Sequence, residues 1–117
     1  MSPETPWPPR PGELLPRASE AYTVPEKLAW ILSGEGHGHE WARVLHIGPD
    51  DTQRFWSAIT DAVIDGDPIF RVTERYGVTC GINIELQIGV RKAKTTTSWH
   101  YKHAHDAPRL VTAYPRP

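Results

Sequence analysis

The spacing of apolar residues changes about halfway along the chain. Up to residue 64, they recur every three or four positions, which is the period of a helix with one buried face. From Ile69 onward, they alternate with polar residues, which is the period of a half-buried strand. Helices therefore come first and strands follow, and this order predicts an α+β domain.

Three helices are expected in the first part of the chain. The first begins with a capping box, because Thr23 stands three residues before Glu26. The second covers residues 39–48. The third, over residues 50–64, is the clearest, since its aromatic and aliphatic residues share one face. These apolar faces are expected to form the core.

Four strands are expected in the second part of the chain. In the second of them, apolar and polar residues alternate without interruption, so one face is buried and the other meets solvent. The expected fold class is α+β, with N-terminal helices packed on one face of a roughly four-stranded antiparallel sheet. The other face would then be free for a ligand. The expected strands cover residues 69–76, 78–90, 94–102 and 109–114.

Length and composition place the chain among single folded domains. At 117 residues it can form one hydrophobic core, and its single cysteine, Cys80, excludes an internal disulfide or a CxxC metal site. Seven of the twelve prolines fall in the first 25 residues. We therefore expect a proline-rich leader or linker over residues 1–20 and a single α+β domain over 21–117. No segment approaches the roughly 20 apolar residues of a membrane span, so no membrane partner is expected.

Charge is distributed unevenly along the chain. The whole chain has a formal net charge of −1, but residues 1–90 carry −6 and residues 91–117 carry +5. A basic C-terminal quarter of this kind favours an anionic partner, although an ordinary solvated sheet face would show the same charges.

The last two expected strands carry candidates for acid–base chemistry. If they pair as an antiparallel hairpin, a polar strip that includes His100 and Lys102 would lie beside Thr112 and Tyr114. Histidine titrates near neutral pH, and a hydroxyl group can donate a hydrogen bond to a developing negative charge. Alternation alone does not decide which set of side chains meets solvent. A merely exposed polar strip is the other interpretation.

The other histidines and two arginines add further candidates. His37 and His39 lie in the glycine-rich stretch GEGHGHE, from which they could face the sheet, while Arg43 and Arg91 could neutralise a phosphate. The six histidines also form two groups, over residues 37–46 and 100–105, that offer imidazole ligands. Neither group has a recognisable metal-site spacing, so no metal and no cofactor are expected.

Several segments resemble a known superfamily. They are PRLVTAYP at the final strand, TTSWHY before it, PEKLAWILSG at the first helix, and GHGHEWARVLHIG. Over about residues 20–115 the chain resembles small bacterial domains that look like members of the barnase-EndoU-colicin-RelE ribonuclease superfamily. The resemblance implies helices that precede a four-stranded antiparallel sheet. It also implies cleavage of RNA without a metal, often by a bacterial toxin.

The resemblance further implies roles for individual residues. The RNA 2′-hydroxyl would attack the adjacent phosphate, which needs a base, an acid and donors that stabilise the transition state. His37 or His39 would act as base or acid, and His100 is the alternative proton donor. Arg43 and Arg91 would contact the phosphate. Thr112 and Tyr114, which belong to the last strand, would complete the site.

These implications extend to partners and location. The expected partners are RNA and an immunity or antitoxin protein, in the cytoplasm or in the cytoplasm of a target cell reached as part of a larger system. The oligomeric state stays open. The alternative from another class is a non-catalytic interaction module of the same fold, which would bind a protein through its free sheet face or a sheet edge.

Overall fold

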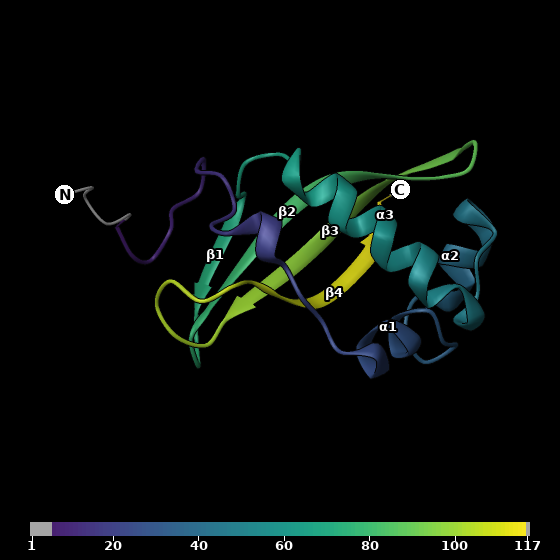
Figure 1. The fold of residues 1–117 in the computed structure, drawn as a ribbon, viewed down its shortest axis with the longest axis horizontal. Helices are drawn as coiled ribbons and strands as arrows, with labels where there is room; N and C mark the ends of the chain where they lie inside the picture. Colours follow the sequence, from purple (N-terminus) through teal and green to yellow (C-terminus); the bar gives the residue numbers. More distant parts are fainter. Residues whose placement is uncertain (1–5, 117) are drawn as a thin grey trace.

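The computed structural model describes residues 6–116 and confirms the expected α+β class. Within this range, three α-helices come before one four-stranded antiparallel sheet (Figure 1). Residues 1–5 of the expected leader, and Pro117, lie outside the described residues. The elements are η1 (Ala18–Glu20), α1 (Pro25–Ile31), α2 (Gly38–Leu45), η2 (Pro49–Asp51), α3 (Thr52–Ile64), β1 (Arg71–Glu74), β2 (Val78–Ile88), β3 (Arg91–Tyr101) and β4 (Arg109–Pro115).

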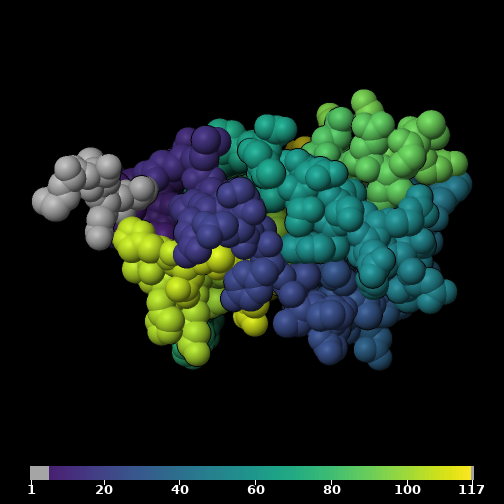
Figure 2. All heavy atoms as spheres, viewed as in Figure 1, coloured from purple at the N-terminus to yellow at the C-terminus, as the bar shows by residue number. Residues whose placement is uncertain are grey.

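The strands follow one another in the sheet in the order β1-β2-β3-β4. The long hairpin of β2 and β3 forms its centre, with Val78 opposite Tyr101 at one end and Ile88 opposite Arg91 at the other. Helix α3 lies across one face of this hairpin (Figure 1). Seen from that side, the helices and the N-terminal segment hide most of the sheet (Figure 2). We call the face toward α3 the inner face and the opposite one the outer face.

The core lies between the inner face and the helices. Trp41 of α2 and Phe55 of α3 are fully buried, and their rings pack edge to face with centroids 4.9 Å apart. The inner face also buries threonines of β3 that are satisfied inside the core. Thr97 Oγ1 donates to the Ile82 carbonyl at 3.0 Å and accepts from Trp99 Nε1 at 2.8 Å. The buried polar groups of Thr97 and Trp99 are therefore paired.

The N-terminal segment packs on the domain at the end of β3. The ring of Trp7 meets that of Tyr101 edge to face at 5.1 Å, and Leu15 is buried in the core. The Tyr101 hydroxyl donates to the Pro16 carbonyl at 2.5 Å. Leu14 of the same segment does not pack on the domain, because its side chain is exposed to solvent.

The two edge strands of the sheet, β1 and β4, are partly covered. Beside β1, Gly12 N donates to the Ile69 carbonyl at 2.8 Å, and prolines of the same segment run along the strand. Beside β4, Leu110 N donates to the Tyr22 carbonyl at 3.0 Å, and Trp41 Nε1 donates to the Ala113 carbonyl at 3.3 Å. This cover occupies part of each edge and so restricts the addition of another strand.

Two helix boundaries differ from the expected ones. The capping box at Thr23 does not form: α1 starts after Val24, and Thr23 Oγ1 is buried with no hydrogen-bond partner among the described residues. The reason is that Tyr22 pairs with β4, which keeps the chain extended through Val24. Helix α2 ends early, at Leu45, because His46 adopts a left-handed conformation. Between residues 6 and 116, no helix is both long and apolar enough to cross a membrane.

Candidate functional site

Polar side chains line up in rows across the outer face. Residues that pair across antiparallel strands share a face, so the register of β2, β3 and β4 fixes these rows. Neighbouring rows are about 7 Å apart, because two residues of a strand separate them. The three rows are the His100 row (Thr79, His100, Arg109), the Ser98 row (Gly81, Ser98, Thr112) and the Tyr114 row (Asn83, Thr96, Tyr114).

A β-bulge in β4 puts Thr112 and Tyr114 on this face. Strict alternation would place Leu110 on the same face as these two residues. Instead Ser98 pairs with Thr112 and Trp99 pairs with Leu110, so Val111 is an extra residue in β4. Leu110 is therefore buried in the core. Ser98 and Thr96 of β3 lie beside Thr112 and Tyr114, whereas His100 pairs with Arg109 and Lys102 lies beyond the end of the strand.

His37 reaches the Tyr114 row from the helical layer. It is the residue before α2, and its ring lies 5.3 Å from that of Tyr114, centroid to centroid. Its Nδ1 lies 3.4 Å from Glu40 Oε1. Gly38 makes the tight approach of this turn possible, since a Cβ there would lie 2.5 Å from the Leu32 carbonyl oxygen. The Trp41 bond to Ala113 then fixes α2 beside Tyr114.

His100 is held at the other end of the rows. Its Nδ1 lies 3.1 Å from Thr79 Oγ1, and Arg109 is its register partner on β4. Gly77, in the turn between β1 and β2, lies against the same ring, because a Cβ on Gly77 would be 3.1 Å from His100 Nε2. The Thr79 contact orients the ring and leaves Nε2 toward the turn.

The Ser98 row lies between these two histidines. Ser98 and Thr112 are half-buried and carry small hydroxyl side chains, and Gly81 carries none. The rows that hold Tyr114 and His100 are two residues away along the strands on opposite sides. A group bound over Ser98 and Thr112 would thus have Tyr114 and His37 on one side and His100 on the other.

Positive charge surrounds the rows. Arg109 lies in the His100 row, and Arg71 of β1 pairs with Gly81 at the β1 side. Lys94 pairs with Glu85 one row beyond Tyr114. The basic C-terminal quarter of the sequence therefore contributes to the outer face through β3 and β4. A negatively charged ligand would be attracted to it.

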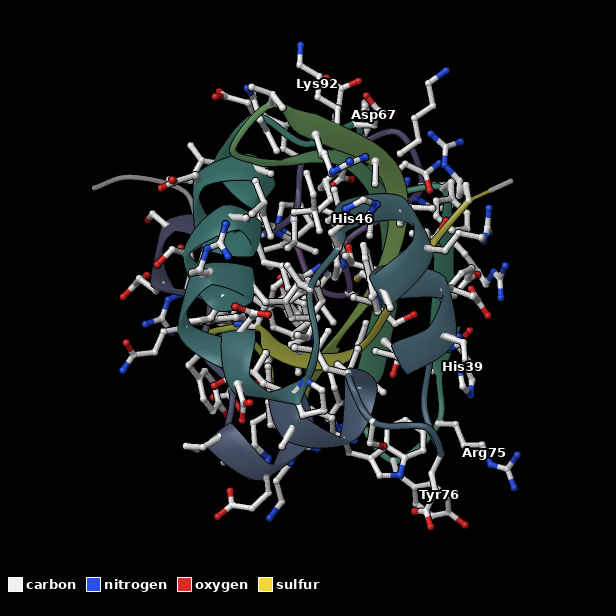
Figure 3. The ribbon with its side chains drawn as sticks, turned by 90° about the vertical axis from the view of Figure 1, so that its right-hand side faces the viewer. His39, His46, Asp67, Arg75, Tyr76 and Lys92 are labelled. Carbon is white, nitrogen blue, oxygen red and sulfur yellow. The ribbon has the colours of Figure 1, made fainter. Side chains whose placement is uncertain are left out.

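The structure separates the other predicted residues from the rows. Arg91 starts β3 and pairs with Ile88 in the far hairpin, nine residues from His100, which corresponds to about 30 Å along a strand. Lys102 follows the end of β3 and is exposed. His39 and Arg43 are exposed on α2, four residues apart, and His39 projects outward from the helix (Figure 3).

Three of the predicted residues, His100, Thr112 and Tyr114, share the outer face, and His37 meets Tyr114 from the helical layer. Arg109 and Thr79, which flank His100, were not among the predicted residues. Only the strand register could have identified them, because nothing in their local sequence marks them. Among residues 6–116, no three His, Cys, Asp or Glu side chains are arranged to hold a metal ion, and neither histidine group forms such a site.

Comparison with known proteins gives one family and no neighbour of known activity. Residues 14–117 match the family model described as "Domain of unknown function (DUF6883)". No curated protein and no solved structure matches the chain significantly. The resemblance to the barnase-EndoU-colicin-RelE superfamily has no support from these matches and stays a hypothesis.

Proposed function

The chain belongs to the DUF6883 family, and we propose that it is a ribonuclease-like domain that cleaves RNA on the outer face without a metal. The observation that supports this proposal best is the arrangement of the three rows. Two hydroxyl groups lie between a histidine–tyrosine pair and a second histidine. This is a set of groups suited to proton transfer on both sides of a phosphate.

The proposed reaction begins with the scissile phosphate over Ser98 and Thr112. The 2′-oxygen attacks phosphorus, and the bond from phosphorus to the 5′-oxygen breaks, so attacking and leaving oxygens lie on opposite sides. One of His37 and His100 accepts the 2′-hydroxyl proton, and the other donates a proton to the leaving 5′-oxygen. His100 takes part after its ring turns Nε2 from the Gly77 turn toward Ser98. The products are a 2′,3′-cyclic phosphate and a 5′-hydroxyl. The need for a 2′-hydroxyl would restrict the reaction to RNA.

Charge and hydroxyl groups on the outer face would stabilise the transition state. Arg109 neighbours His100, and Tyr114 neighbours His37, so each can donate a hydrogen bond to the phosphate oxygens. Lys94 and Arg71 would attract the rest of the backbone. Glu40 beside His37 would favour one ring orientation, in the way that a carboxylate orients a catalytic histidine.

The resemblance to the superfamily supports the same proposal from the sequence. It extends the proposal to a bacterial toxin that acts on cytoplasmic RNA and is controlled by an immunity or antitoxin protein. Such a partner would protect the producing cell by covering the outer face.

The test is cleavage of total bacterial RNA and isolated tRNA by the purified chain in EDTA. We expect discrete fragments that end in 2′,3′-cyclic phosphate. His37→Ala and His100→Ala should each lower the rate 10²- to 10⁴-fold, as expected for loss of a general acid or base. The matched control is His103→Ala, in the exposed turn after β3, which should keep the wild-type rate. RNA that stays intact with the folded wild-type protein would reject the proposal.

The second candidate function is a non-catalytic module that binds a protein. The covered edges favour the outer face as the contact surface in that case, since part of each edge is already occupied. His37→Ala and His100→Ala separate the two functions. A module of this kind would cleave no RNA in any variant, and its partner binding would survive the loss of either histidine.

A further inference from the structure

We propose that Tyr76 and Phe70 are stacking platforms for unpaired bases of a single-stranded RNA along the β1 side of the outer face. The inference rests on the proposed function and deepens it, because it names the form of the substrate. Tyr76 lies in the turn between β1 and β2, and Phe70 immediately precedes β1.

Tyr76 has no packing role that would explain its side chain. It is 86% exposed, the most exposed aromatic residue among residues 6–116. Its φ of 54° lies in the left-handed region, which disfavours a bulky side chain and in hairpin turns is usually occupied by Gly, Asn or Asp. The fold therefore carries a large ring where a small residue would fit the turn better. We therefore look for the function of the Tyr76 ring in a ligand that binds to it from solvent.

An arginine lies against each aromatic ring. The Arg75 guanidinium carbon is 5.6 Å from the centroid of Tyr76, and that of Arg71 is 5.3 Å from Phe70. Arg75 and Tyr76 both project from the molecule on the side away from α3 (Figure 3). A ring beside a cation combines the two interactions that single-stranded nucleic acids use, base stacking and phosphate contact.

Both rings adjoin the rows of the candidate site. The Phe70 ring covers Gly81 of the Ser98 row, since a Cβ on Gly81 would lie 2.8 Å from Phe70 Cζ. Tyr76 is followed by Gly77, which lies against the His100 ring. An RNA strand with its phosphate over Ser98 would therefore meet Phe70 beside the phosphate and Tyr76 beyond His100.

Stacking of this kind selects single strands. Bases in a duplex are already stacked and paired, so their faces are not available to Tyr76 or Phe70. Every unpaired base has a flat face that can stack on an aromatic ring, so we expect the stacking to depend little on the RNA sequence.

The test measures RNA binding apart from cleavage. The probe is a short, fluorescently labelled single-stranded RNA with 2′-O-methyl groups, which removes the attacking hydroxyl, and binding is followed by anisotropy. Tyr76→Ala should raise Kd about 5- to 150-fold, the range for loss of one base–aromatic stack. Tyr76→Phe should keep the wild-type Kd, because stacking needs the ring and not the hydroxyl. Phe70→Leu, checked for an unchanged unfolding midpoint, should weaken binding in the same direction.

Two controls make the result specific. Val90 is 96% exposed in the β2–β3 turn, at the opposite end of the same strands, so Val90→Ala should leave Kd unchanged. A 2′-O-methyl duplex of the same sequence should bind wild type and Tyr76→Ala equally. If wild type binds the single strand and Tyr76→Ala binds it as well, the inference is wrong while the proposed function stands. If wild type neither binds nor cleaves RNA, both fail.

Discussion

Trp41 is the residue that joins the candidate site to the core. It is fully buried on α2, its ring packs against Phe55, and its Nε1 donates to the Ala113 carbonyl of β4. The same helix begins directly after His37, whose ring meets Tyr114. Trp41→Phe would keep an aromatic ring in the core and remove the bond between helix and strand.

The expected loss of stability is the sum of two terms. Loss of the indole hydrogen bond leaves the Ala113 carbonyl unpaired and costs about 1 kcal/mol. The smaller ring leaves unfilled space of about one to two methylene groups, which costs about 1 kcal/mol more. The total of about 2 kcal/mol is a large fraction of the roughly 5–15 kcal/mol by which a domain of this size is stable.

Urea denaturation followed by far-UV circular dichroism measures this loss. With a slope of about 2 kcal/mol/M, the unfolding midpoint of Trp41→Phe should fall by about 1 M. The matched control is Trp30→Phe on α1, where the ring is 45% exposed, and its midpoint should change by no more than about 0.25 M. Equal midpoints for the two variants would refute the role given to Trp41. Under the proposed function, RNA cleavage by folded Trp41→Phe should also be slower, since His37 is less well fixed.

Further predictions concern two groups outside the candidate site, Tyr101 and Cys80. Tyr101→Phe removes the hydroxyl that binds the Pro16 carbonyl, and it should lower the free energy of unfolding by about 1 kcal/mol in the same urea assay; no change would show that this bond does not hold the N-terminal segment. Burial raises the pKa of the Cys80 thiol to about 11, so the folded thiol should resist thiol reagents at pH 8. The unfolded thiol loses its proton from pH 9.0 upward while the folded one keeps it, so stability present below pH 9.0 should decline toward pH 11. Cys80→Ala should flatten that decline, and an identical pH profile for the variant would contradict the assignment to Cys80.

The fold class followed from periodicity alone, because both periods are properties of single segments. Strands with uninterrupted alternation, such as β2, were placed within one or two residues. The bulge at Val111 could not be predicted in this way, since it arises from pairing with β3. It changes the assignment of faces: Leu110 is buried, and Thr112 and Tyr114 face outward.

The candidate site also depends on contacts between segments that are far apart in the sequence. Arg91 was a candidate contact for the phosphate, but the extended strand β3 carries it to the far hairpin, away from His100. His37 was expected to be able to face the sheet, and the packing of α2 on β4 brings it to Tyr114. The Thr23 capping box failed for a related reason, because Tyr22 pairs with β4 and keeps the chain extended. Spacing in the sequence predicted the residue types of the site and not which of them meet.

RNA binding to the outer face can be mapped residue by residue. Two-dimensional ¹H–¹⁵N NMR spectra of the labelled protein would be recorded during titration with a single-stranded 2′-O-methyl RNA. We predict shifts of the amide signals of Thr79, Ser98, Thr112 and Tyr114, which lie on the outer face, with little change in α3 behind the sheet. Shifts confined to α3, or a spectrum unchanged by RNA, would contradict this prediction.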